Sequence, residues 1–296
     1  MTSDHVTPDH LIRADAVLGE GIQWHSDAGL WWTDIQSSAI FQHDLAGGMT
    51  RRFATPERVG SFALIEGSGD LLCAFASGFG RFDPAAGTLD WLHRVEEPGG
   101  PRRFNDGRVD RSGNFWAGTM VEKGTSSDAA LYRLARDGAL RVCVDGVTIS
   151  NGLCWSPDGR VMYFADSPAR TIYAYPVDPA DGTLGARRVF ATTPEGAYPD
   201  GATVDCEGCL WSAQWGASRV VRYRPDGTND QILTLPVSQP TCVAFIGPDL
   251  RMLAITTARD GLEPAALADQ PLAGDILVYK TIVAGLPEMQ YHPTTG

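Results

Sequence analysis

The feature of this sequence that most constrains its fold is a pattern of short apolar strands that recurs six times. The repeats align on the segment that starts the second strand of each unit, and they are spaced 41 to 49 residues apart. A period of this length, with about four short strands per unit, is typical of a β-propeller. The six aligned segments are 30–32, 70–72, 115–116, 161–163, 210–211 and 251–253.

The chain between these segments supports the same interpretation. Residues 29–34 and 160–166 alternate apolar and polar side chains, and turn dipeptides such as Asp106-Gly107 and Asp158-Gly159 recur between strands. Alternation bounded by such turns is the pattern of antiparallel strands. Because six units fill the chain, we predict an all-β fold, a six-bladed β-propeller that forms a single domain over residues 1–296.

Three shorter segments carry predictions of their own. Residues 11–16 are expected to return to the last blade and to close the ring. We expect residues 1–10 to form a flexible N-terminus. Helical periodicity is visible over residues 263–270, so a short helix is predicted there.

The composition excludes several classes of partner. The chain has 36 acidic and 24 basic residues and a formal charge of −12, whereas nucleic acids and anionic membranes attract basic surfaces. No apolar run approaches the roughly 18 residues of a membrane span, and the first ten residues do not resemble a signal peptide. We therefore expect a cytoplasmic protein without nucleic-acid or membrane partners. The sequence indicates no particular oligomeric state.

The repeat also predicts where a functional site lies. In a propeller the first strand of each blade lines the central channel, so residues just before those strands meet at one mouth of the channel. In every repeat the residue eleven positions before the aligned position is polar. We predict that these six residues are neighbours in space: Glu20, Ser61, Asn105, Asn151, Asp200 and Thr241.

The two carboxylates and two carboxamides of this set indicate a metal site. Their oxygen atoms suit hard divalent cations such as Ca²⁺, Mg²⁺ or Mn²⁺. A cation would also offset the cost of placing like charges in a partly dry cavity. No histidine lies near these positions. The competing interpretation is that the polar side chains cap turns, as Asx residues before glycine commonly do.

Arginine and tryptophan side chains near the predicted mouth have two interpretations each. Arg103 precedes Asn105 by two residues, so its guanidinium could donate to substrate oxygens or to a developing oxyanion. The alternative is an ion pair with a surface carboxylate. Trp215 either edges the pocket or packs in the core, and core packing is favoured. The chain has no Gly-x-Ser-x-Gly elbow, phosphate-binding loop or dinucleotide fingerprint.

Seven short motifs follow one another along nearly the whole chain. They are Leu18-Gly-Glu-Gly21, Arg103-Phe-Asn-Asp-Gly107, Gly118-Thr-Met120, Ser150-Asn-Gly-Leu153, Ser156-Pro-Asp-Gly159, Tyr198-Pro-Asp-Gly201 and Val204-Asp205. In this order and at this spacing they resemble the SMP-30/gluconolactonase/regucalcin-like family. Together the motifs are specific, although each alone is weak. The resemblance implies a six-bladed propeller with one divalent metal cation in its channel.

The resemblance also implies roles for individual residues. Glu20, Asn151 and Asp200 would be the metal ligands, and Asp200 would also serve as the general base. Arg103 and Asn105 would contact the substrate. Apart from Arg103, these are residues that the repeat register selects independently.

The family pattern departs from this sequence after Gly118-Thr-Met120. Some animal members of the family have a glutamate there that contacts the substrate, and here Lys123 matches that position, with Glu122 beside it. We predict Glu122 as a further substrate contact and keep Lys123 as the alternative.

The resemblance predicts a metal-dependent hydrolase that opens aldonolactones to aldonic acids in bacterial pentose or hexose oxidation. Residues 256–259 and 271–274 are more similar to the bacterial sugar lactonases of the family. Two alternatives remain on the same scaffold: an esterase or phosphotriesterase, and a non-catalytic, calcium-binding regulatory propeller. The residues leave open whether the metal is Ca²⁺, Zn²⁺, Mn²⁺, Mg²⁺ or Fe²⁺, and which sugar lactone fits best.

Overall fold

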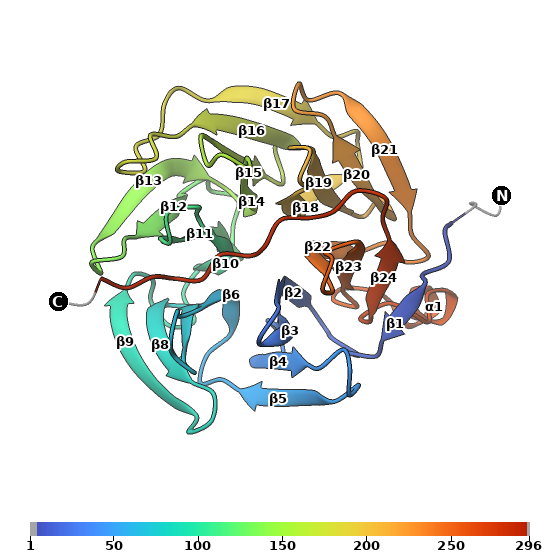
Figure 1. The fold of residues 1–296 in the computed structure, drawn as a ribbon, viewed down its shortest axis with the longest axis horizontal. Coiled ribbons are helices and arrows are strands. Elements are labelled where there is room, and N and C mark those ends of the chain that lie inside the picture. The colour runs from blue at the N-terminus through green and yellow to red at the C-terminus, as the bar shows by residue number, and fades with distance from the viewer. Residues whose placement is uncertain (1–4, 295–296) are drawn as a thin grey trace.

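Six four-stranded antiparallel sheets form a ring of blades around a central channel (Figure 1). This arrangement is seen in a computed structural model, which describes residues 5–294. The predicted all-β, six-bladed propeller is therefore confirmed. Each blade runs from an innermost strand at the channel to an outermost strand at the rim.

Blades 1 to 3 follow one another along the chain. Blade 1 contains β2 (Gly19–His25), β3 (Gly29–Asp34), β4 (Ala39–His43) and β5 (Thr50–Ala54). Blade 2 contains β6 (Val59–Leu64), β7 (Leu71–Phe75), β8 (Gly78–Asp83) and β9 (Thr88–Arg94). Blade 3 contains β10 (Arg102–Val109), β11 (Phe115–Val121), β12 (Ala129–Leu134) and β13 (Leu140–Val147).

Blades 4 and 5 repeat this order, and blade 6 combines both ends of the chain. Blade 4 contains β14 (Ser150–Trp155), β15 (Val161–Asp166), β16 (Thr171–Pro176) and β17 (Arg188–Thr192). Blade 5 contains β18 (Tyr198–Val204), β19 (Leu210–Trp215), β20 (Arg219–Tyr223) and β21 (Asn229–Thr234). Blade 6 contains β22 (Pro240–Ile246), β23 (Met252–Thr257), β24 (Ile276–Lys280) and, from the N-terminal end, β1 (His10–Ile12).

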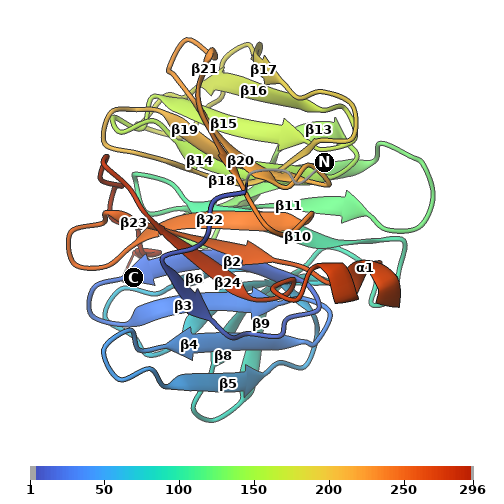
Figure 2. The same cartoon turned by 90° about the vertical axis from the view of Figure 1, so that its right-hand side faces the viewer.

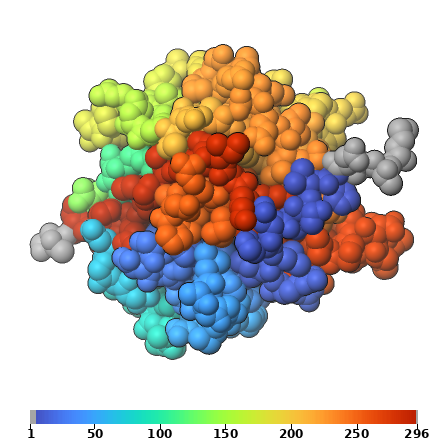
Figure 3. Space-filling view, turned by 45° about the vertical axis from the view of Figure 1, so that its right-hand side comes forward, coloured from blue at the N-terminus to red at the C-terminus, as the bar shows by residue number. Residues whose placement is uncertain are grey.

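The N-terminal strand closes the ring. β1 pairs antiparallel with β24, so that His10 lies opposite Val278. In Figure 3 the blue surface of the N-terminal segment lies against the red surface of the last blade. The predicted closure is confirmed, although the paired strand covers His10–Ile12 rather than residues 11–16.

Two further segments were predicted from the sequence. The helix α1 (Pro264–Asp269) lies between β23 and β24 and projects from the edge of the ring (Figure 2). Of the expected flexible N-terminus, residues 1–4 lie outside the described residues, and the amide of Val6 donates to the carbonyl of Thr234 over 3.0 Å. No helix in the described part of the chain is long and apolar enough to cross a membrane.

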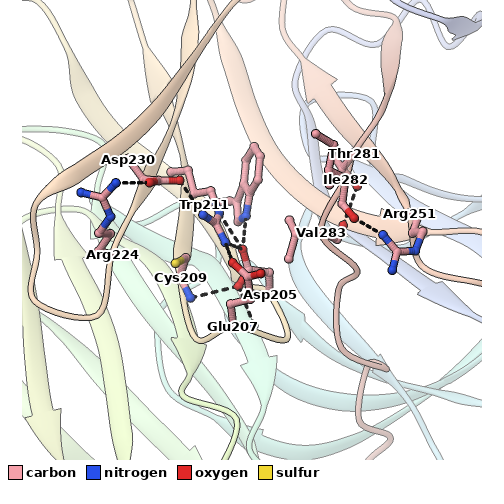
Figure 4. A network of polar contacts seen from close by, with 11 residues as sticks. Asp205, Glu207, Cys209, Trp211, Arg224, Asp230, Arg251, Thr281, Ile282 and Val283 are labelled. Atoms are coloured by element: carbon pink, nitrogen blue, oxygen red, sulfur yellow. Dashed lines mark hydrogen bonds and ion pairs between the residues drawn. The ribbon is translucent and has the colours of Figure 1, made fainter.

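A repeated hydrogen-bond motif fixes the turn between the first and second strands of blades 3 and 5. The indole Nε1 of Trp211 donates to Oδ2 of Asp205 over 2.8 Å, and the amide of Cys209 donates to Oδ1 over 3.0 Å (Figure 4). In blade 3, Trp116 donates to Asp110 in the same way, over 2.7 Å. The same spacing of aspartate and tryptophan in two repeats thus produces the same turn.

The hydrophobic core lies between adjacent blades. Trp211 of blade 5 meets Phe245 of blade 6 edge to face, with ring centroids 5.8 Å apart. Phe79 of blade 2 meets Phe104 of blade 3 in the same manner at 4.7 Å. Aromatic pairs of this kind favour edge-to-face geometry and bury large apolar areas. Because each blade packs on two neighbours, the innermost strands are held in fixed positions around the channel.

The C-terminal segment covers the end of the channel that lies opposite the predicted mouth. After β24 the chain runs across the centre of the ring, as Figure 1 shows. Glu288 of this segment forms an ion pair with Arg108 over 3.3 Å. Arg108 also donates to the carbonyl of Ala202 over 2.9 Å, so it joins the segment to the wall of the channel.

Candidate metal and substrate site

Four of the six predicted channel residues line one cavity of about 330 Å³ at the mouth of the channel. Glu20 comes from β2, Asn105 from β10, Asn151 from β14 and Asp200 from β18. Residues from four different blades therefore meet in one place, as the repeat register predicts. The cavity wall also contains Arg103, Ser167, Tyr198, Trp215 and Asp260.

The position of these residues relative to the strands differs from the prediction. They lie inside the innermost strands, near the beginning of each, and not just before them. The pairing with the second strand shifts just after Glu20 and just after Asn151. Gly21 and Gly152 occupy these bulges with φ of 57° and 62°, a conformation that glycine adopts without steric cost. Bulges re-aim neighbouring side chains, which explains how Glu20 and Asn151 reach the cavity from within a strand.

The remaining two predicted channel residues are not among the described residues that line the cavity. Ser61 is fully buried, and its hydroxyl has no hydrogen-bond partner among residues 5–294. The hydroxyl of Thr241 contacts the carbonyl of Gly19 and the hydroxyl of Thr256. These short side chains remain within the packed wall of the channel and do not reach its opening.

A chain of hydrogen bonds fixes the two asparagines. Asn105 donates from Nδ2 to Oδ1 of Asn151 over 3.0 Å, and Asn151 donates from its own Nδ2 to Oγ of Ser167 over 2.8 Å. Ser167 then donates to the carbonyl of Pro199 over 2.7 Å. A carboxamide oxygen has two lone pairs, so Oδ1 of Asn151 keeps one for a further ligand. These contacts join blades 3, 4 and 5 and do not cap local turns, so they do not support the turn-capping interpretation of the asparagines.

Arg103 lines the cavity and is held there by other side chains. Its Nε donates to Oε1 of Glu122 over 2.8 Å, and its Nη1 donates to Oδ1 of Asn105 over 2.7 Å. The side chain is buried. Among the described residues, no hydrogen bond uses its Nη2. This nitrogen can therefore donate to a bound substrate, as the first interpretation of Arg103 requires.

Glu122 lies behind Arg103. Arg58 donates to both oxygens of Glu122, over 2.8 and 2.7 Å. Burial opposes ionisation of this carboxyl group, but the hydrogen bonds from Arg58 and the charge of Arg103 prevail and lower the pKa of Glu122 to about 2. Lys123 instead donates to the carbonyl of Gly99 over 3.1 Å. Neither Glu122 nor Lys123 is among the described residues that line the cavity, and a substrate contact by Glu122 stays a prediction.

Three buried carboxyl groups lie close enough to influence one another: Glu20, Asp106 and Asp200. Burial, and then the negative charge of Glu20, raise the pKa of Asp200 well above its ordinary value. Burial and the charge of Asp106 raise the pKa of Glu20, while the charge of Arg103 acts in the opposite direction. Ionisation of all three carboxyl groups is therefore unfavourable without a further positive charge at the site.

This donor set fits a divalent cation. Two carboxylates and one amide oxygen are the ligands that hard cations prefer, and a cation would relieve the repulsion that raises the pKa values of Glu20 and Asp200. Within residues 5–294, no three His, Cys, Asp or Glu side chains form a cluster that could hold a metal ion. The oxygen of Asn151 lines the same cavity as Glu20 and Asp200 and is available as a further donor of the kind that such a cation prefers.

Several residues of the cavity escaped the sequence analysis. The sequence predicts no role for Ser167 or Asp260, and it favours core packing for Trp215. Trp215 ends β19, while Ser167 and Asp260 follow β15 and β23. In an antiparallel blade the end of the second strand lies beside the start of the first. Residues at or just after the ends of the second strands are therefore candidates for the cavity wall, and this relationship could have identified Ser167, Trp215 and Asp260 from the sequence.

Comparison with known proteins connects this site to a family. The profile of the SMP-30/gluconolactonase/LRE-like region matches residues 18–259. The chain belongs to this family. An L-arabinolactonase of Azospirillum brasilense is 39% identical over 99% of both chains. A 6-deoxy-6-sulfogluconolactonase of Pseudomonas putida is 38% identical over 94% of this chain and 96% of its own.

Solved structures lead to the same family. The calcium-binding protein regucalcin from Agrobacterium tumefaciens has a TM-score of 0.91 and 31% identity, with 98% of this chain and 99% of that chain covered. The predicted resemblance to the SMP-30/gluconolactonase family is therefore confirmed. Of the residues described for the cavity, Asp260 alone lies just outside the matched region of 18–259.

Proposed function

We propose that this protein is a metal-dependent lactonase that hydrolyses aldonolactones to aldonic acids. The observation that carries the proposal is the convergence of Glu20, Asn151, Asp200, Asn105 and Arg103 in one cavity of a chain from this family. Two relatives at 38% and 39% identity over nearly their full length are named as sugar lactonases, which supports the same reaction class.

In this proposal Glu20, Asn151 and Asp200 hold one divalent cation. When bound, such a cation supplies Lewis-acid polarisation of a carbonyl oxygen and positive charge for the developing oxyanion. The calcium-binding relative supports a divalent ion, while the oxygen ligands leave Ca²⁺, Mn²⁺, Mg²⁺, Zn²⁺ and Fe²⁺ as candidates.

Asp200 is the proposed general base. In its ionised form it takes a proton from the attacking water, whose oxygen adds to the lactone carbonyl carbon. The bond between that carbon and the ring oxygen then breaks, and the proton passes to the ring oxygen. The products are a free hydroxyl and a carboxylic acid, so one water is consumed for each ring opened.

Arg103 and Asn105 are the proposed orienting residues. The free Nη2 of Arg103 can donate to the lactone ring or its hydroxyls, and Asn105 adds a neighbouring amide in the same wall. Holding the carbonyl against the base in one geometry lowers the entropic part of the barrier. Tyr198 and Trp215 supply aromatic surface in the same cavity, against which the C–H faces of a sugar ring can pack.

The test is a hydrolysis panel at constant pH with protein loaded with each candidate cation. The panel contains C5 and C6 aldonolactones, p-nitrophenyl acetate and a phosphotriester, with Glu20→Gln protein as the matched control. We expect the aldonolactones to be hydrolysed with the highest kcat/KM and the control to approach the spontaneous rate. Faster hydrolysis of the ester or the phosphotriester would contradict the proposal. Metal-loaded protein that hydrolyses no lactone would favour a non-catalytic calcium-binding role.

A further inference from the structure

One charged residue of the cavity has no role in the proposed mechanism. The charged side chains of the wall are Glu20, Arg103, Asp200 and Asp260. Glu20 and Asp200 are the proposed cation ligands, and Arg103 is paired with Glu122. Asp260 is the remaining charge, and it lies outside the ligand set.

Hydrogen bonds hold the backbone of Asp260 on both sides, while its carboxylate accepts few hydrogen bonds. Its amide donates to the carbonyl of Val17 over 3.0 Å, and its own carbonyl accepts from Nε2 of Gln239 over 3.1 Å. The carboxylate accepts one hydrogen bond, from Nε2 of Gln36 over 3.1 Å. The side chain is therefore held at the cavity by a neutral partner.

No cation of the described chain is close enough to pair with Asp260. The adjacent Arg259 forms an ion pair with Asp15 instead, over 2.6 Å. Arg58 donates to Oε1 of Gln36 over 3.4 Å and so reaches Asp260 only through that amide. Within residues 5–294, Asp260 therefore presents a carboxylate that no direct ion pair offsets. An ionised carboxylate accepts hydrogen bonds but donates none, so it favours ligands that carry hydroxyl groups.

The order of the blades places Asp260 across the cavity from Arg103. Asp260 follows β23 of blade 6, whereas Arg103 lies in β10 of blade 3. In a closed ring of six blades, blades 3 and 6 face each other. In the proposed mechanism, a lactone oriented by Arg103 and Asn105 would extend its far end towards Asp260.

We infer that Asp260 selects neutral lactones, whose far end carries hydroxyl groups, against lactones that carry a sulfonate, phosphate or carboxylate there. This inference rests on the proposed lactonase function. A hydroxyl can donate to the carboxylate, whereas an anionic group meets a like charge there. Like charges placed face to face in a binding site disfavour the wrong partner strongly.

Overall similarity does not decide between two kinds of substrate that the names of relatives suggest. The relative named as a 6-deoxy-6-sulfogluconolactonase and the relative named as an L-arabinolactonase are 38% and 39% identical to this chain. The names imply a sulfonated substrate in the first case and a neutral one in the second. The charge of Asp260 assigns this chain to the neutral class.

The experiment compares two substrates that differ only at carbon 6: D-glucono-1,5-lactone and 6-deoxy-6-sulfo-D-glucono-1,5-lactone. Metal-loaded wild-type protein, Asp260→Asn and Asp260→Ser are measured for kcat and KM at low and high salt. Asp269→Asn is the matched control, because it removes the same charge from an exposed position of α1 that does not line the cavity. Thermal melting of each variant checks that it is folded.

We expect wild-type protein to favour the neutral lactone, chiefly through KM. Both Asp260 variants should reduce that preference by about tenfold, which corresponds to about 1.4 kcal/mol. The preference of wild-type protein should weaken at high salt, and the control should leave the ratio unchanged.

Equal or better use of the sulfonated lactone by wild-type protein would overturn the inference and leave the lactonase function intact. An unchanged ratio in folded Asp260 variants would do the same. Failure to hydrolyse either lactone would overturn the proposed function itself, and this inference with it.

Discussion

Asn105 donates a hydrogen bond from Nδ2 to Oδ1 of Asn151 over 3.0 Å, across the boundary between blades 3 and 4. The two residues are 46 positions apart in the sequence and occupy comparable places in successive repeats. Their contact means that the proposed ligand oxygen of Asn151 is oriented by another residue of the same cavity. In the proposed mechanism, this contact couples metal binding by Asn151 to substrate binding by Asn105.

Ser167 is predicted to act on the metal through Asn151. Ser167→Ala removes the acceptor that orients the Nδ2 of Asn151. Loss of such an outer partner typically costs about 10-fold to 100-fold in metal affinity, and we expect a loss of that size. Titration calorimetry with the cation measures it. Ser126→Ala, in an exposed loop, is the control, and equal affinity in both variants would contradict the coupling.

Glu122 is predicted to position Arg103. Glu122→Gln weakens the ion pairs with Arg103 and Arg58, so the guanidinium is less well oriented. Because misplacement of an orienting group is costly, we expect kcat/KM for the neutral lactone to fall roughly tenfold to a hundredfold. The neighbouring Lys123→Gln should have little effect, since the hydrogen bond of the Lys123 ammonium within residues 5–294 goes to the carbonyl of Gly99. A larger effect from Lys123→Gln than from Glu122→Gln would contradict the role given to Glu122.

The carboxylate of Glu122 should also stabilise the fold, and this contribution should disappear in acid. Its pKa falls from an ordinary value of 4.5 to about 2 in the folded protein. A carboxyl group with a lowered pKa stabilises the fold above its ordinary pKa, and this stabilisation is lost as the pH falls towards the folded-state value. Urea unfolding of wild-type protein and Glu122→Gln between pH 5 and about 2 should therefore give free energies of unfolding that converge with falling pH. A constant difference between the two proteins would contradict this assignment.

Asp205 is predicted to be the most sensitive polar position of blade 5. It is fully buried, and it accepts hydrogen bonds from Trp211, Cys209 and Arg222. Asp205→Ala leaves these donors without their acceptor, and we expect a loss of about 2–4 kcal/mol in the free energy of unfolding. The more exposed Asp230→Ala should cost much less, because ion pairs near the surface contribute little to stability. Equal losses in chemical denaturation would contradict the structural role given to the aspartate–tryptophan turn.

The sequence predicted the ring and most of the proposed metal site because both depend on the repeat. Glu20, Asn105, Asn151 and Asp200 occupy one register position, and a propeller brings equivalent positions of all blades to one channel. The same rule failed for Ser61 and Thr241, because short hydroxyl side chains are taken up within the packed wall. Register identifies the position of a residue but not the reach of its side chain.

The other residues of the cavity could not be predicted from their position in the sequence repeat. Ser167 and Asp260 lie in connections after second strands, and these connections differ in length between blades. Arg58 reaches the site indirectly, through Glu122 and through Gln36, so its contribution depends on contacts between blades. Such contacts depend on three-dimensional packing, for which a single sequence has no periodic signal.

The most direct test of the central claim is the metal content of the protein after loading with a divalent cation and removal of unbound ions. Wild-type protein, Asp200→Asn and the double variant Glu20→Gln/Asp200→Asn are compared by elemental analysis, with lactone hydrolysis measured on the same samples. We expect one cation per wild-type chain and none in the double variant. Hydrolysis should fall by at least about 10²-fold to 10⁴-fold in Asp200→Asn through loss of the base alone. One tightly held cation per chain in the double variant, or normal hydrolysis by Asp200→Asn, would contradict the central claim.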